Sequence, residues 1–151
     1  IDIEMTDDYL FKISCEVGVT SSEISVEEIT EKLGVSPHRF FRKGDYVSSR
    51  HSGTKGVRGY NLWAVSSSER IFKYENVRPA IKELRKILGG KKRERALLEL
   101  KNDKRCDVSM FIRVETDDAG IGMDVLEDEI AFLNLMNWVH ITCLPNQEID
   151  G

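Results

Sequence analysis

The chain has 151 residues, of which 40% are hydrophobic and 32% are charged, and its net charge is −4. No apolar run approaches the roughly 20 residues that span a bilayer, and the acidic start IDIEMTDDYLF lacks the basic region of a signal peptide. We therefore expect one cytoplasmic domain over 1–151, with frayed ends at 1–7 and 145–151.

Charge is distributed in blocks along the chain. Residues 1–37 carry nine acidic and two basic side chains, 38–105 carry seven and nineteen, and 106–151 carry ten and one. Such blocks can mark surfaces for partners. The alternative is that they neutralise one another within the fold, and the sequence leaves both open.

The first elements are a strand and a capped helix. Apolar and other residues alternate from 9 to 17, which predicts a strand with one buried face. Ser25 and Glu28 form a capping box, and Gly34 stands where a left-handed C-cap belongs. The apolar residues between them recur at helical spacing, so the sequence predicts a helix over 25–34.

Residues 38–59 combine cations, aromatic rings and glycines. One interpretation is an anion-binding segment, in which arginines neutralise phosphates and rings stack on bases. The other interpretation is structural: Phe40 or Phe41 fills the core, and 48–56 is a loop between two short strands. The cations that would bind the anion are Arg39, Arg42, Lys43, Arg50 and Arg58.

A strand and two helices are predicted next. YNLWAV over 60–65 indicates a strand with Leu62 or Trp63 facing inward, and helices follow over 77–88 and 91–100. Four cations lie at 91–95, where a helix start disfavours positive charge. They form either a patch for an anionic partner or a solvated helix face.

The C-terminal third repeats the order of the first. Alternation over 106–115 predicts a strand, and Asp124 with Glu127 forms a second capping pair. The helix that follows would present one apolar side and stop at Asn137 in a left-handed conformation, before a strand over 138–143. That apolar side comprises Leu126, Ile130, Leu133 and Met136.

Strand–helix–strand units at 9–41 and 106–144 enclose a helical pair, which indicates an α+β fold. We expect a mainly antiparallel sheet with helices packed on one face, in a ferredoxin-like arrangement that is single or doubled. The predicted core of this fold comprises Phe11, Ile13, Trp63, Val108, Met110 and Ile112, covered by Leu33, Leu84, Ile130 and Leu133.

Catalytic and metal-binding patterns are lacking in the sequence. Cys15, Cys106 and Cys143 lie far apart on predicted strands, and no histidine accompanies them at ligand spacing. His38, His51 and His140 stand alone, without a recognisable nucleophile or paired carboxylates. We therefore expect reduced cysteines, no metal, no cofactor and no enzymatic activity.

Short motifs across nearly the whole chain carry a family resemblance. LGVSP at 33–37, then RKG at 42–44, then LW at 62–63 and the ending WVHITCL are similar to a bacterial family of domains of unknown function, numbered 4279. The resemblance implies a small cytoplasmic protein. Relatives encoded beside toxins imply the role of an immunity protein.

The expected function is therefore direct binding of a toxin domain, of the nuclease type, with no membrane or nucleic-acid partner and an oligomeric state that the sequence leaves open. Carboxylates imitate phosphates and would block the cationic cleft of a nuclease. The alternative is a module that binds nucleic acid or an anionic ligand through 38–58 and 91–95. The predicted acidic contact residues are Asp117, Asp118, Asp124, Glu127 and Asp128, with Glu27, Glu28 and Glu31 as a second face.

Overall fold

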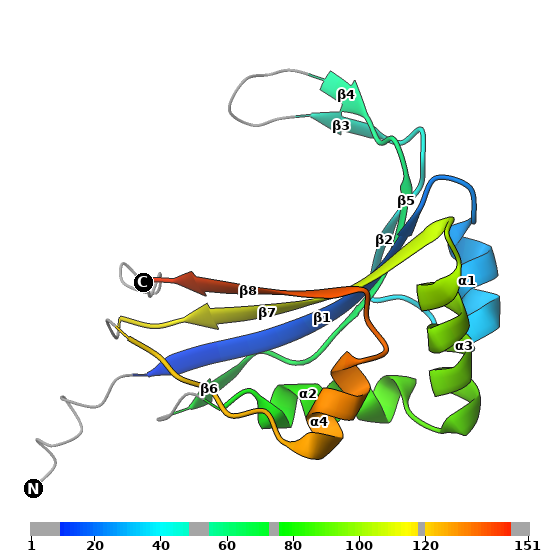
Figure 1. The fold of residues 1–151 in the computed structure, drawn as a ribbon. Coiled ribbons are helices and arrows are strands. Elements are labelled where there is room, and N and C mark those ends of the chain that lie inside the picture. Colours follow the sequence, from blue (N-terminus) through cyan, green and yellow to red (C-terminus); the bar gives the residue numbers. More distant parts are fainter. Residues whose placement is uncertain (1–9, 49–54, 73–75, 118–119, 146–151) are drawn as a thin grey trace, which may run out of the picture.

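The computed structural model describes residues 10–48, 55–72, 76–117 and 120–145. Its four helices and eight strands confirm the α+β class, and the strands form a mainly antiparallel sheet (Figure 1). The predicted frayed ends lie, apart from Pro145, outside the described residues. No described helix is long and apolar enough to cross a membrane.

The large sheet has the strand order β2-β5-β1-β7-β8, and β6 also pairs with β1. Every pair is antiparallel except β7 with β8. The bounds are β1 Phe11–Ser21, β2 Arg39–Phe41, β5 Asn61–Ser66, β6 Arg70–Phe72, β7 Cys106–Glu115 and β8 Trp138–Leu144. A separate hairpin pairs β3 Tyr46–Ser48 with β4 Lys55–Val57.

This topology is one ferredoxin-like unit with an addition. Strands β2, β5, β1 and β7 have the order and directions of that unit, and β5 and β6 follow one another along the same edge of β1. The second predicted unit is a parallel β7–α4–β8 extension of the same sheet. The described residues therefore hold a single unit, and the doubled alternative is not what this sheet forms.

All four helices lie on one face of the sheet, as predicted (Figure 1). Their bounds are α1 Val26–Leu33, α2 Arg78–Leu88, α3 Lys91–Asn102 and α4 Glu127–Leu133. Helix α1 begins at the expected cap, because the Ser25 side chain accepts a hydrogen bond from the Glu28 amide at 3.1 Å, and it ends at left-handed Gly34. The second bond of the predicted capping box is replaced by one from Ser25 Oγ to Glu28 Oε1 at 3.5 Å.

The core lies between the sheet and these helices. Every predicted core strand residue is buried there, with Ile13, Trp63, Val108 and Met110 fully so. Leu33 and Leu84 cover the sheet as predicted, and Leu133 packs against the core while partly buried. Burial of alternate β1 residues follows from the period-two pattern of the strand.

Helix α4 corrects three expectations. It begins at Glu127, after the predicted cap Asp124, because the Glu129 carboxylate accepts a hydrogen bond from the Leu126 amide. Its buried residues are Glu129 and Phe132, so Ile130, 53% exposed, does not cover the sheet. No described non-glycine residue has a positive φ, so Asn137 is not a left-handed stop.

The prediction that Phe40 or Phe41 fills the core is also wrong. Phe40 is 48% exposed, and Phe41 lies partly buried on the face that the helices leave uncovered. Trp63, which is paired with Phe40, is fully buried in the core, because β5 lies between β1 and β2 whereas β2 is the edge strand.

Candidate functional site

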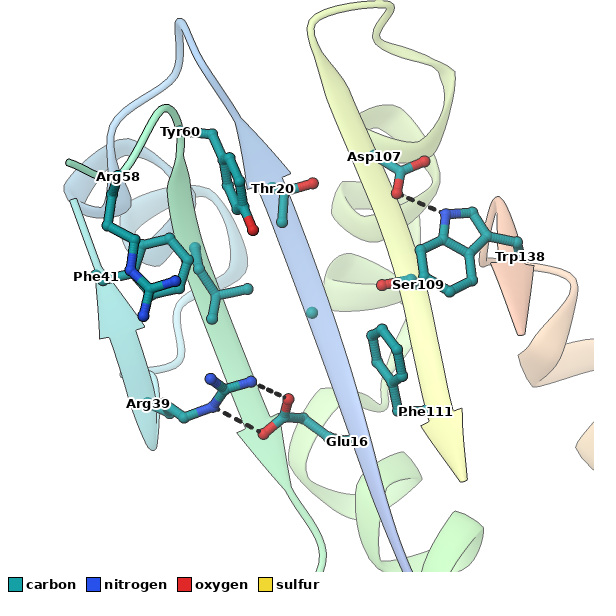
Figure 2. Close-up of a pocket in the computed structure, with 12 residues that line it drawn as sticks. Glu16, Thr20, Arg39, Phe41, Arg58, Tyr60, Asp107, Ser109, Phe111 and Trp138 are labelled. Carbon is teal, nitrogen blue, oxygen red and sulfur yellow. Dashed lines mark hydrogen bonds and ion pairs between the residues drawn. The ribbon is translucent and has the colours of Figure 1, made fainter. Parts of the chain in front are cut away.

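The sheet face opposite the helices, which we call the open face, carries a hollow of about 410 Å³ (Figure 2). Its floor is β1, which contributes Glu16, Gly18 and Thr20. One wall comes from β2, β5 and the segment before β5, and consists of Arg39, Phe41, Arg58, Tyr60 and Leu62. The opposite wall comes from β7 and β8 and consists of Asp107, Ser109, Phe111 and Trp138.

Strand pairing places these residues side by side. Gly18 is paired with Ala64 on one side and with Ser109 on the other. Because side chains alternate between the faces, the neighbours two residues along on each strand share the open face. Gly18 has no side chain, and this leaves the centre of the floor low. A Cβ added there would meet Leu62 Cδ1 at 3.5 Å and Ser109 Oγ at 3.7 Å, which is ordinary contact.

Two aromatic rings and a guanidinium form the first wall. The Arg58 Cζ atom lies 4.0 Å from the centroid of the Phe41 ring. Phe41 meets Tyr60 edge-on, with the two ring centroids 5.3 Å apart. No carboxylate of the described residues forms an ion pair with Arg58. This guanidinium therefore offers its hydrogen-bond donors at the rim of the hollow.

The floor holds an ion pair at its lower end (Figure 2). Arg39 Nη2 donates to Glu16 Oε1 at 2.6 Å, and Ser66 Oγ donates to Glu16 Oε2 at 2.9 Å. The hydrogen bond with Glu16 raises the pKa of Arg39. The positive charge of Arg39 is therefore neutralised by Glu16 of the same chain.

Aromatic rings also form the second wall. The rings of Phe111 and Trp138 meet edge-on, with their centroids 5.2 Å apart. The centroid of the His140 ring lies 5.7 Å from that of Phe111. The indole Nε1 of Trp138 donates to Asp107 Oδ2 at 2.6 Å, which fixes the ring over the wall. Phe111 and Trp138 remain 40% and 42% exposed, so both rings are open to a ligand.

The lining combines exposed aromatic rings with arginines. Each of the two carboxylates among the described lining residues accepts a hydrogen bond from an arginine or an indole. Exposed aromatic rings and arginines are typical of the residues that dominate protein interfaces.

The predicted acidic contact residues are separated in the structure. Glu27, Glu28 and Glu31 lie exposed on α1, whereas Asp124, Glu127 and Asp128 lie exposed at the start of α4. Helix α1 packs beside α3, and α4 packs beside α2. Asp117 is described and has an interaction within the protein, and Asp118 lies outside the described residues.

Two of these acids form ion pairs with residues of the basic middle block. Glu27 pairs with Arg42, and Asp128 Oδ2 lies 3.0 Å from Arg85 Nη1. The pKa of each carboxyl is lowered. For Glu27 the main cause is the hydrogen bond with Arg42, whereas for Asp128 it is the hydrogen bond with Glu129, followed by the one with Arg85. Charge blocks therefore neutralise one another in part, which was the alternative that the sequence left open.

The cations predicted to form the alternative anion site do not form one free cluster among the described residues. Arg39 and Arg42 pair with carboxylates, Lys43 donates its backbone amide to Asn61 Oδ1 at 2.8 Å, and Arg50 lies outside the described residues. At the start of α3, Arg93 donates to the Ile87 carbonyl. Of the predicted cations in 38–58 that the structure describes, Arg39 and Arg58 line the hollow.

The predicted cysteine positions hold, since all three lie on strands. Cys15 is buried, and burial raises the pKa of its thiol to about 12. Cys106 is partly buried and Cys143 is exposed. Among the described residues, no three histidine, cysteine or acidic side chains gather at metal-ligand spacing. The expectation that no metal binds stays a prediction.

Sequence reasoning missed most of the hollow. Phe111 and Trp138 occupy the polar phase of their strands' alternation, where solvated residues are expected. An aromatic ring in that phase was the available signal. Such a ring indicates that the polar face of the strand also contacts other side chains or a ligand.

Comparison with known proteins assigns a family. The model of a family described as "Domain of unknown function (DUF4279)" matches residues 11–138. Comparison with curated proteins gave no match, and comparison with solved structures gave none either. The matched range runs from the start of β1 to Trp138, the first residue of β8, and includes all the described residues that line the hollow. The chain therefore belongs to the DUF4279 family of domains of unknown function.

Proposed function

We propose that this protein is a non-enzymatic binding domain that takes a segment of a partner protein into the hollow of the open face. The observation that carries the proposal is the set of exposed aromatic rings and arginines around a hollow whose floor is a glycine. Tyrosine, tryptophan and arginine supply much of the binding energy at protein interfaces, because they bury large areas in few rotamers.

The lining also suggests what the partner segment presents. Apolar side chains of the partner would pack between Tyr60 and Phe111, above Gly18. Arg58 would donate hydrogen bonds to an acidic side chain of the partner. No described carboxylate forms an ion pair with its guanidinium, and a desolvated arginine needs an anionic partner. The partner segment is thus apolar with one adjacent carboxylate.

A toxin domain is the partner that the family resemblance favours, and the protein would then act as an immunity protein. Binding in the hollow differs from the acidic surface predicted from sequence, in which Asp124, Glu127 and Asp128 make the contact. The two surfaces lie on different faces of the molecule, since α4 is on the helix-covered face and the hollow is on the open face (Figure 1). One set of variants can therefore separate them.

The test measures binding of the purified protein to the product of the neighbouring toxin gene by calorimetry, together with rescue of cells that express the toxin. Gly18→Val should fill the floor, and Phe111→Ala should remove one wall. We expect each to weaken binding by about 2 kcal/mol or more, as at interface hot spots. Phe40→Ala is the matched control, because Phe40 is 48% exposed, against 40% for Phe111, but lies outside the hollow.

Charge reversal of Asp124, Glu127 and Asp128 together should leave binding near the wild-type value. If this variant fails to bind while Gly18→Val binds normally, the contact lies at α4 and the hollow is the wrong surface. If neither the wild-type protein nor any variant binds or rescues, the immunity role is wrong.

A further inference from the structure

The outer edge of β8 is built differently from the opposite edge of the sheet. Strand β2 ends the sheet on one side with three residues, including Arg39. Strand β8 ends it on the other side with seven residues, WVHITCL, none of them charged. Proteins usually protect an edge strand by making it short or by adding charge or proline, because its free backbone groups pair with other strands. Edge β2 has this protection, and β8 lacks it within its length.

Backbone direction shows which groups of β8 are available. The Leu144 carbonyl accepts a hydrogen bond from the Thr116 amide at 2.9 Å, so it points toward β7. Neighbouring residues of a strand point their backbone groups in opposite directions. The amides and carbonyls of Val139, Ile141 and Cys143 therefore point away from β7, and no described strand pairs with them.

Side chains leave this strand apolar and open on the helix side, and uncharged on both faces. Val139 and Ile141 are 38% and 52% exposed on the helix side, and Cys143 is exposed there as well. On the open face, Trp138 is 42% exposed. An exposed and uncharged edge of this length is typical of a strand that another strand completes.

We propose that β8 pairs antiparallel with β8 of a second copy of the chain, about a two-fold axis at Ile141. Ile141 is the central one of the three residues whose backbone groups point outward, so an axis there lets all three form hydrogen-bonded pairs with one another. Ile141 then faces Ile141 of the partner subunit, and Val139 faces Cys143 of the partner subunit. In each of these pairs the two residues exchange both backbone N–H···O hydrogen bonds, as in a hydrogen-bonded antiparallel pair.

The register matches side chains on both faces. The pairs Ile141 with itself and Val139 with Cys143 are apolar, His140 meets Thr142 of the partner subunit, and Trp138 meets Leu144 of the partner subunit. No pair opposes two charges, which would be destabilising in a sheet. A second copy is thus a complementary occupant by sequence alone. The axis is perpendicular to the sheet, so both open faces stay uncovered, and the inference does not depend on the proposed function.

Sedimentation velocity over about a hundredfold range of protein concentration tests the pairing, because a self-associating chain shifts with concentration. The wild-type protein should approach twice the 17.3 kDa chain mass. Ile141→Lys places two cations opposite each other and should raise the dimer dissociation constant about tenfold or more. Ile130→Lys is the matched control, since Ile130 is 53% exposed on α4, and it should dimerise normally. Circular dichroism should show that both variants fold.

Two further measurements test the register. In the Cys143→Ser background, Ile141→Cys should form a disulfide-linked dimer on oxidation, because paired Cα atoms about 5.5 Å apart are within disulfide reach. Ile130→Cys in the same background should not. Hydrogen exchange should show the amides of Val139, Ile141 and Cys143 slowing with concentration.

Each opposite result overturns the proposal: a wild-type monomer throughout the range, a dimer unaffected by Ile141→Lys, or crosslinking by Ile130→Cys in place of Ile141→Cys. A dimer without slowed amides would mean that the copies meet through another surface.

Discussion

Two strand–helix–strand units with the same order of elements take different places in this sheet. In the first, β1–α1–β2, strand β5 lies between β1 and β2. In the second, β7–α4–β8, the two strands pair directly and in parallel. The same local pattern thus allows two connections. What differs is whether another strand of the chain is available to fill the space between them.

The helices of the two units differ accordingly. Helix α1 crosses above β5 and buries Val26, Ile29 and Leu33. Helix α4 lies beside α2, and its buried residues are Glu129 and Phe132. A helix that covers a central strand buries a full apolar stripe, whereas one at the margin buries a narrower one. Matched substitutions in the two units can test this difference.

The largest expected effect comes from the corresponding isoleucines of the two helices. Ile29→Ala should lower the free energy of unfolding by about 2–5 kcal/mol, because Ile29 is fully buried and its loss leaves a cavity. Ile130→Ala should cost less than about 1 kcal/mol, since Ile130 is 53% exposed. Urea unfolding of both variants measures the difference. Equal losses would contradict the assignment of α4 to the margin.

A smaller effect is expected from two asparagines that tie loops to the sheet. Asn61 accepts from the Lys43 amide at 2.8 Å and donates to the Ile24 carbonyl at 2.9 Å. Asn137 accepts from the Val108 amide at 2.7 Å and donates to the Lys101 carbonyl at 3.1 Å. Asn61 is buried, so Asn61→Ala leaves unsatisfied groups and should cost about 1–3 kcal/mol.

Asn137 is exposed, and water can replace its lost bonds. Asn137→Ala should therefore cost less than Asn61→Ala in the same unfolding experiment. The reverse order would show that the second unit depends on its loop more than the first.

The smallest effect concerns pH and the first-turn acids Glu27 and Asp128. Both pKa values are lowered in the folded protein, so both groups stabilise the fold above their unfolded values, which lie near 4.5 and 3.8. This contribution is lost as the pH falls from those values through the lower folded ones. Both side chains are exposed, so the stabilisation is small.

NMR titration of the two carboxyls measures the causes separately. Arg42→Gln should raise the pKa of Glu27 clearly, because Arg42 is the main cause of its shift. Arg85→Gln should raise the pKa of Asp128 less, because hydrogen bonding with Glu129 is the larger cause there. A larger change at Asp128 would contradict this ranking.

The sequence by itself determined the elements and the core. Alternation in β1 and β7, the capping box at Ser25 and the helical spacing of Ile81 and Leu84 all depend on residues close together in the chain. Each predicted element of this kind is present, and the strand residues predicted to be buried are buried. Local geometry and hydrophobic periodicity are sufficient for these features, because they need no knowledge of which strands become neighbours.

Only the tertiary structure decided the order of the strands, the exposure of Ile130 and the hollow. Glu16, Arg58, Phe111 and Trp138 belong to segments far apart in the chain, and they share one face because β5 and β7 pair with β1 from opposite sides and β8 pairs with β7. Strand pairing is long-range, and several orders bury the same apolar stripes about equally well. The periodicity that fixes the elements therefore leaves the binding surface undetermined.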